Sequence, residues 1–89
     1  MRIQKIVFSS HALTRMKERG ISQKLVIEAI KNPDKIEKSS LRPSRFLIKK
    51  LYFNQKLQRE HLLMIISEVK PNLIKVVIII DTSKISKYF

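Results

Sequence analysis

Two stretches near the N-terminus carry apolar residues at the spacing of a helix. In the first, three apolar side chains fall within about 100° of one another on a helical wheel: Ala12, Leu13 and Met16. Ser9 or Ser10 can cap this helix, and Gly20 follows its last periodic residue, where a left-handed backbone favours a residue without a side chain. The pattern predicts a helix over His11–Arg19 that ends at Gly20.

The second stretch follows directly. Its apolar stripe consists of Leu25, Val26, Ala29 and Ile30. Ser22 can cap the helix, and Asn32 with Pro33 ends it, because proline cannot continue the helical hydrogen bonds. We predict a second helix over Gln23–Lys31.

Beyond Pro33 the apolar residues come in short, β-branched runs, which is the pattern of strands. The predicted strands are Lys35–Ser39, Arg45–Phe53, His61–Val69 and Leu73–Asp81. Turn-compatible segments at 54–60 and 70–72 join the last three, so we expect these to form an antiparallel meander. Val76–Ile80 is apolar at consecutive positions, which predicts a central strand that helices cover on at least one face.

Two weaker segments complete the pattern. A less regular run at Arg2–Phe8 indicates a short first strand, and Ser83–Phe89 is a polar, basic tail that can form a docked turn. No internal repeat or change in composition divides the chain, so residues 1–89 are expected to form one domain. The expected fold class is α+β, with the two N-terminal helices packed on one face of a twisted antiparallel sheet of about four strands.

Composition narrows the classes of function. The longest apolar runs, Leu62–Ile66 and Val76–Ile80, are far shorter than the ~20 residues of a membrane helix, and Met1–Ser10 lacks the apolar core of a signal peptide. We therefore expect a cytoplasmic protein without a membrane partner. Cysteine is absent, which excludes disulfides, thiol catalysis and thiolate zinc sites and leaves His11 and His61 as the only imidazoles. We expect no metal and no cofactor.

The net charge of +12, from 19 basic and 7 acidic residues, is the strongest compositional signal. A field of that size attracts polyanions and opposes self-association, so nucleic acid is the leading expected partner. The basic excess is densest over residues 35–60. An acidic protein or an anionic lipid would satisfy the same charge, and a strongly solvated surface is the plainer interpretation.

One face of the first predicted helix gathers four polar side chains: His11, Arg15, Glu18 and Arg19. His11 would lie in the first turn, where free backbone N–H groups and the helix dipole favour an anion such as a phosphate. This arrangement suits a phosphodiester substrate. The plainer interpretation is the charged outer face of any amphipathic helix, with Arg15 and Glu18 as an ordinary i, i+3 pair.

Other candidate residues lie in the predicted strands. His61 can transfer protons or can simply occupy a hairpin edge, and the Thr82 hydroxyl can reach a ligand or make a local turn hydrogen bond. Four cations lie close together in the sequence: Arg42, Arg45, Lys49 and Lys50. They indicate a track that binds nucleic-acid phosphates or, at the two lysines, an edge strand protected from aggregation. The acidic residues are scattered without ligand spacing, which gives no support to a two-metal nuclease.

The segment from Ser9 to Ile21, SSHALTRMKERGI, followed by Val26 and Asn32-Pro33, resembles domain-of-unknown-function family 4258. The resemblance covers both predicted helices densely. It covers the rest of the chain loosely, through the apolar strand that runs into Asp81-Thr82.

That family is similar to the RelE-like and barnase-like ribonucleases, in which two N-terminal helices pack on a curved antiparallel sheet. Many members of this wider group are toxins of toxin–antitoxin pairs. The resemblance therefore implies a RelE-like fold, a metal-independent endoribonuclease and an acidic antitoxin as a partner. It assigns His11, Arg15 and Arg19, and more weakly Thr82, to the site.

The leading hypothesis from the sequence is RNA cleavage by attack of a 2′-hydroxyl on the adjacent phosphate. His11 is the expected general base or acid, Arg15 and Arg19 would stabilise charge on the phosphoryl oxygens, and Glu18 or His61 would supply the second proton-transfer group. One alternative is a non-catalytic basic module that binds nucleic acid, because helix–Gly20–helix superficially resembles a helix-turn-helix. Another is a protein-interaction element whose basic surface an acidic chain covers.

Overall fold

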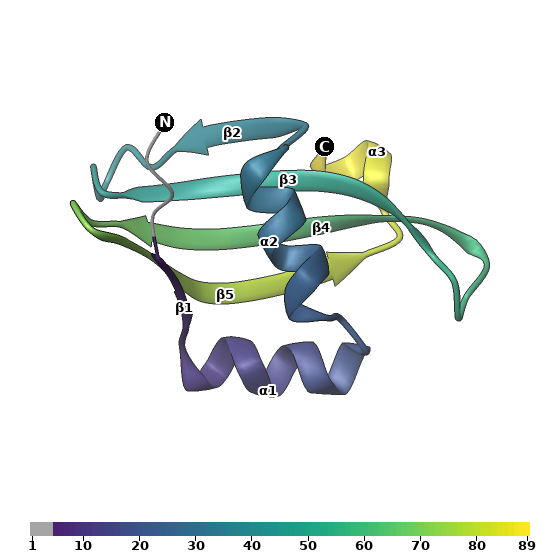
Figure 1. The fold of residues 1–89 in the computed structure, drawn as a ribbon. Helices are drawn as coiled ribbons and strands as arrows, with labels where there is room; N and C mark the ends of the chain where they lie inside the picture. The colour runs from purple at the N-terminus through teal and green to yellow at the C-terminus, as the bar shows by residue number, and fades with distance from the viewer. Residues whose placement is uncertain (1–4) are drawn as a thin grey trace.

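One five-stranded sheet and three helices make up residues 5–89, which are the residues that the computed structural model describes (Figure 1). The strand order across the sheet is β1-β5-β4-β3-β2. The strands are β1 (Lys5–Phe8), β2 (Lys35–Lys38), β3 (Arg45–Asn54), β4 (Arg59–Val69) and β5 (Leu73–Thr82). The helices are α1 (Ser10–Arg19), α2 (Gln23–Lys31) and α3 (Ile85–Tyr88).

The predicted antiparallel meander of β3, β4 and β5 is confirmed, but the sheet as a whole is mixed. β1 pairs with β5 in parallel, with Lys5 opposite Leu73 and Phe8 opposite Val76. No hairpin joins these two strands, because they are distant in the sequence, so no turn imposes an antiparallel direction on them. The expectation of about four antiparallel strands is corrected to five strands with one parallel pair. The predicted start of the first strand, at Arg2, lies outside the described residues.

The ends of α1 and α2 follow from local chemistry. Ser9 is the cap of α1, since its Oγ accepts a hydrogen bond of 3.0 Å from the backbone N–H of Ala12. Gly20 ends the helix in the left-handed region, with φ of 66°. Ser22 caps α2 in the same way as Ser9 caps α1, through the N–H of Leu25 at 3.1 Å.

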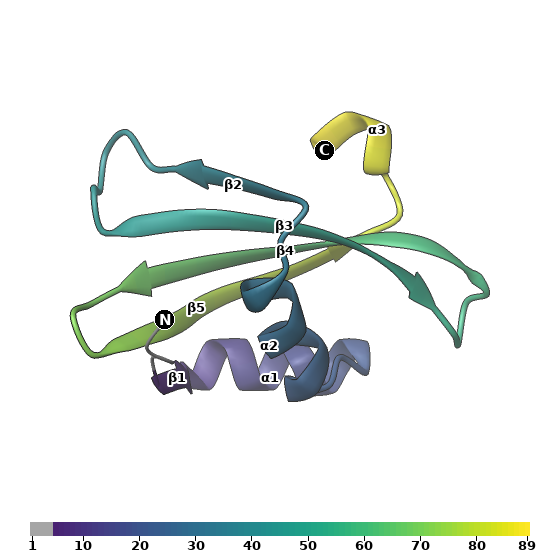
Figure 2. The ribbon, with the colours of Figure 1, turned by 45° about the horizontal axis from the view of Figure 1, so that its top comes forward.

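Helices cover both sides of the sheet, and the core lies on the side of α1 and α2. Figure 2 shows α1 and α2 on one side and the short α3, the docked turn expected in the tail, on the other. The core between α1, α2 and the sheet contains Ala12, Met16, Ile21, Val26, Ala29, Ile48, Leu63, Ile65, Val76 and Ile79. β5 is an interior strand as expected, but the middle place belongs to β4, where residues 61–65 are all buried. Nowhere in residues 5–89 is there a helix with the length and apolar character needed to cross a membrane.

Strand side chains alternate between the two faces of the sheet. This alternation builds the core and also places polar groups at one end of the core. Successive strand residues point to opposite faces, so His61 lies on the helix side with Leu63 and Ile65. Tyr52 lies directly opposite His61 in β3, and Asp81 lies opposite Leu63 in β5. In Figure 1, the end of α1 reaches the side of the molecule where the β3–β4 hairpin lies.

Candidate functional site

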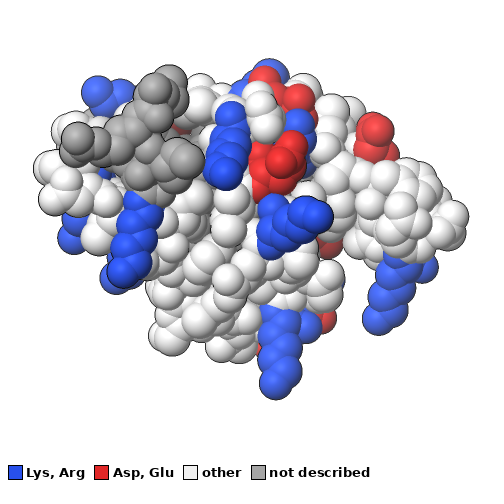
Figure 3. Space-filling model, viewed as in Figure 1, with Lys and Arg blue, Asp and Glu red and all other residues white. Residues whose placement is uncertain are grey.

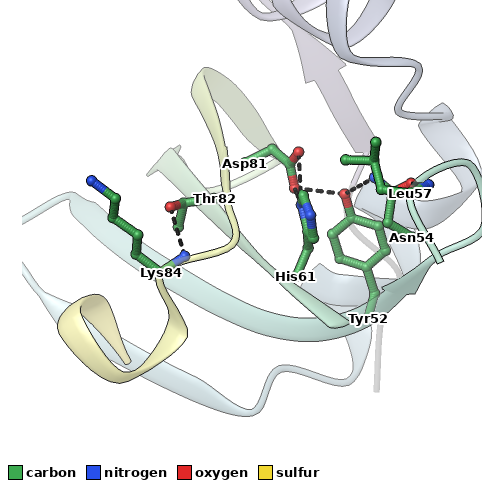
Figure 4. A network of polar contacts seen from close by, with 7 residues as sticks. All are labelled: Tyr52, Asn54, Leu57, His61, Asp81, Thr82 and Lys84. Atoms are coloured by element: carbon green, nitrogen blue, oxygen red, sulfur yellow. Dashed lines mark hydrogen bonds and ion pairs between the residues drawn. The ribbon is translucent and has the colours of Figure 1, made fainter. Parts of the chain in front are cut away.

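Three side chains from three neighbouring strands form a polar cluster: Tyr52, which is half-buried, and His61 and Asp81, which are buried (Figure 4). His61 Nδ1 lies 3.1 Å from Asp81 Oδ1 and 3.2 Å from Asp81 Oδ2. The Tyr52 hydroxyl donates a hydrogen bond of 2.6 Å to Asp81 Oδ1. A single carboxylate therefore accepts from both neighbours.

Burial and charge act on the Tyr52 hydroxyl of this cluster. The side chains of His61 and Asp81 are only 6% and 5% exposed. Burial, together with the hydrogen bond to Asp81 and its negative charge, raises the pKa of Tyr52 to about 12, so its hydroxyl remains a donor at neutral pH. We assign the ring hydrogen of His61 to Nδ1, where both carboxyl oxygens of Asp81 lie within hydrogen-bond distance, so that Nε2 is the ring nitrogen with the lone pair. Nε2 is buried and has no hydrogen-bond partner among residues 5–89.

A hollow of about 440 Å³ lies beside the cluster and joins it to α1 and to the β3–β4 hairpin. Its wall is formed by Glu18, Arg19, Asn54, Lys56, Leu57, Arg59, His61, Asp81, Thr82 and Ser83. Three exposed cations stand at its edge, Arg19, Lys56 and Arg59, and none of them forms an ion pair within residues 5–89. The part of the chain that the structure describes holds no group of three or more His, Asp or Glu side chains that could bind a metal ion. The hollow thus combines an imidazole, a carboxylate that holds it, and positive charge.

Four of the six residues predicted to be catalytic line this hollow: Glu18, Arg19, His61 and Thr82. The Thr82 side chain points away from Asp81 in Figure 4, and its Oγ1 accepts a hydrogen bond of 3.1 Å from the backbone N–H of Lys84. This is the local turn hydrogen bond that the sequence left open as the plainer alternative.

The other two predicted residues, His11 and Arg15, lie away from the hollow. His11 is exposed in the first turn of α1, eight residues before Arg19, which is about 12 Å along the helix axis. Arg15 forms an ion pair of 3.6 Å with Glu18, the ordinary i, i+3 contact. The polar face of α1 is therefore not one site, because only Glu18 and Arg19, in its last turn, line the hollow.

The four cations predicted to bind flanking phosphates do not form one track: Arg42, Arg45, Lys49 and Lys50. Lys49 is 7% exposed, and its Nζ contacts Glu37 Oε2 at 2.9 Å and the carbonyl oxygen of Tyr88 at 2.6 Å. Lys50 points to the opposite face of β3, as consecutive strand residues must. The edge-strand interpretation is also wrong, since β3 lies between β2 and β4. The face drawn in Figure 3 likewise shows Lys and Arg side chains standing apart, with acidic side chains between some of them.

The remaining two of these cations lie at the far end of β3. Arg45 donates from Nε to Glu68 Oε2 at 3.1 Å, and this contact holds the pKa of the Glu68 carboxyl below its ordinary value. Arg42 is exposed, in the loop between β2 and β3. Neither residue lines the hollow beside His61.

Sequence reasoning missed Asp81 and Tyr52. Counting outward from the predicted 54–60 turn places Phe53 opposite His61, one residue away from the Tyr52–His61 pair that the structure has. A signal for Asp81 was present, since counting outward from the predicted 70–72 turn places it opposite His61 and on the same face. The structure places it opposite Leu63 on that face, because the ladder begins at Val69–Ile74 and then shifts by one residue between Ile66 and Ser67.

Comparison with known proteins identifies the family of this chain. The family model described as "Domain of unknown function (DUF4258)" matches residues 8–86, so the chain belongs to this family. Comparisons with curated proteins and with solved structures return no match.

Proposed function

We propose that this member of the DUF4258 family is an endoribonuclease with a RelE-like fold that cleaves RNA without a metal ion. The observation that carries the proposal is the hollow in which Asp81 holds His61 beside three exposed cations. Acid–base transfer by a positioned imidazole and charge stabilisation at the phosphate are the two contributions that this reaction needs. A toxin-like role with an acidic antitoxin remains a prediction of the family resemblance.

The proposed reaction is an internal transfer of the phosphoryl group. The 2′-oxygen attacks the adjacent phosphorus, a 2′-O–P bond forms and the P–O5′ bond breaks. One proton leaves the 2′-hydroxyl and one is added to the departing 5′-oxygen, so the products are a 2′,3′-cyclic phosphate and a 5′-hydroxyl. The step consumes no water.

The residues of the hollow are assigned as follows. His61 Nε2 exchanges a proton with the ribose, and Asp81 holds Nδ1–H and stabilises the imidazolium that forms. Arg19 neutralises the phosphoryl oxygens, and Glu18, in the same wall, is the second proton-transfer group. Because Nε2 is buried, RNA must first displace part of the wall, of which residues 55–58 of the hairpin are exposed.

The two histidines of the chain provide a matched test. Wild type, His61→Ala and His11→Ala are incubated with a single-stranded RNA of defined sequence in EDTA, and the cleaved ends are mapped. We expect wild type and His11→Ala to leave 2′,3′-cyclic phosphate ends. His61→Ala should lose about 10²-fold or more of the rate, the contribution of a positioned acid or base.

A second pair of variants tests the hollow without changing His61, whose replacement could disturb folding because it is buried. Arg19→Ala should slow cleavage, whereas Arg42→Ala, which removes an equal charge outside the hollow, should not. Circular dichroism and thermal unfolding establish that each variant is folded. Retained cleavage by folded His61→Ala, or loss of cleavage in His11→Ala alone, would refute the assignment.

The second candidate function is a non-catalytic basic module that binds nucleic acid. The burial of His61 Nε2 favours this function, since a histidine closed off from solvent can have a structural role in the cluster without taking part in catalysis. Binding without cleavage by wild type, with a steep salt dependence and a preference for duplex DNA, would favour this function over the nuclease.

A further inference from the structure

β5 contains one residue more than β4 can pair. Ser67 pairs with Val76 and Ile66 with Ile78, so Val77 is the extra residue of a bulge. Beyond the bulge, regular pairing resumes and continues to the end of the strand.

The bulge decides which face Asp81 occupies. In the structure, Asp81 lies opposite Leu63 and on the same side as His61. Regular pairing continued from the observed pairs Val69–Ile74 and Ser67–Val76 would place Asp81 opposite Leu62 and Thr82 opposite His61. Because neighbouring strand residues point to opposite faces, Asp81 would then face α3 and leave His61 without its carboxylate.

The apolar pattern of β5 does not choose between these two registers. A slip of one residue normally moves apolar side chains to solvent, which is what specifies a register. Val76–Ile80 is apolar at five consecutive positions, so the slip exchanges one apolar side chain for another on both faces. A contact outside the β4–β5 ladder must therefore favour the observed register.

Ser9 makes such a contact at the bulge itself. Its Oγ donates a hydrogen bond of 2.8 Å to the carbonyl oxygen of Val77, while it accepts the N–H of Ala12 at the start of α1. The backbone N–H of Ser9 donates to the carbonyl oxygen of Val76 at 2.9 Å. We propose that Ser9 is a positioning residue, which holds the Val77 bulge and thereby sets the β5 register that places Asp81 against His61. Its effect on cleavage rests on the proposed function, whereas its effect on register does not.

The test reads the register directly by NMR in wild type, Ser9→Ala, Ser9→Thr and Ser22→Ala. The two readouts are the cross-strand contact between Leu63 and Asp81 and the signal of the hydrogen-bonded His61 Nδ1–H. Ser9→Ala should weaken both and gain a contact between Leu62 and Asp81. Ser9→Thr keeps the hydroxyl and should retain both. Ser22→Ala loses an equivalent helix cap without a contact to β5, and should also retain both.

Deletion of Val77 in the Ser9→Ala background provides the rescue. Without Val77, the pairs Ser67–Val76 and Ile66–Ile78 become consecutive, so the turn alone places Asp81 opposite Leu63. The double variant should therefore recover the Leu63–Asp81 contact and the His61 signal. A role of Ser9 in capping α1 alone predicts no such recovery.

The outcomes separate this inference from the nuclease. It is overturned if folded Ser9→Ala keeps the Leu63–Asp81 contact, or if the deletion fails to restore it. If Ser9→Ala does not fold, the double variant decides alone. A double variant that folds with the Leu63–Asp81 contact supports the inference, and one that lacks this contact or does not fold overturns it. Cleavage by the same samples should fall about tenfold or more in Ser9→Ala and return in the double variant. If the register shifts as expected but the wild-type protein cleaves no RNA, the nuclease is refuted and the inference about Ser9 is supported.

Discussion

At the scale of single residues, the candidate site depends on one buried carboxylate with two donors. Asp81 accepts from the Tyr52 hydroxyl and from His61 Nδ1, and both contacts lie on the helix side of the sheet. A buried carboxylate without such partners is strongly unfavourable, which explains why the cluster joins residues from three strands. Tyr52 thus supports the charge that in turn holds His61.

The ionisation of Tyr52 provides a prediction at this scale. Below pH 10 the tyrosine is protonated in both the folded and the unfolded chain. Between pH 10 and about 12 the unfolded chain loses this proton first, so the free energy of unfolding should fall as the pH rises. The chain has two tyrosines and no tryptophan, so the phenolate absorbance of the variant Tyr88→Phe reports Tyr52 alone. We expect its midpoint near 12.

Asp81→Asn in the Tyr88→Phe background is the control for that titration. Removing the negative charge should lower the Tyr52 midpoint, while the remaining burial keeps it above 10. An unchanged midpoint would show that Asp81 does not act on Tyr52.

At the scale of elements, Gly20 sets the angle at which α1 turns into α2. Its φ of 66° is a left-handed conformation, and a methyl group placed there meets no atom within 4 Å. The cost of Gly20→Ala is therefore conformational rather than steric, about 1 kcal/mol of the free energy of unfolding. Gly20→Asn should cost less, because asparagine tolerates this conformation better. Urea unfolding of the two variants checks the difference, and equal losses would contradict the explanation.

The elements that could be predicted from the sequence are those whose causes are local. The bounds of α2, the end of α1 at Gly20 and the three-stranded meander each follow from caps, turns and periodicity within a few residues. The parallel pairing of β1 and the bulge at Val77 depend on contacts between residues nearly seventy positions apart, such as that of Ser9 with Val77. For the same reason Arg19 and His61 could be singled out separately, but the hollow that joins them could not be predicted.

At the scale of the whole molecule, the positive charge is widely distributed, and only part of it lies at the hollow. The dense basic segment 35–60 is divided between the two faces of β3 and partly engaged by acidic side chains, as at Lys49 and Arg45. Attraction of RNA by the overall field and its binding at the hollow are therefore two separate effects.

Salt dependence distinguishes these effects. If RNA contacts Arg19, the slope of log affinity against log salt should become shallower by about 0.7 in Arg19→Ala, the value for one contact with a single-stranded phosphate. Arg42→Ala removes the same charge at the far end of β3 and should leave the slope nearly unchanged. Fluorescence anisotropy with a labelled RNA over a series of salt concentrations measures both. Equal changes would mean that only the overall field binds RNA.

The pairing of β1 with β5 also governs how the chain can acquire its structure during translation. Residues 5–8 reach the ribosome exit long before residues 73–76, to which they pair, and the apolar faces of α1 and α2 have no completed sheet to cover until then. Contacts of such high sequence separation slow folding and leave apolar surface open while they are awaited. A nascent chain that has not yet delivered β5 carries two amphipathic segments without a core. Because it also lacks Asp81, the partner of His61, it lacks the proposed cleavage centre as well.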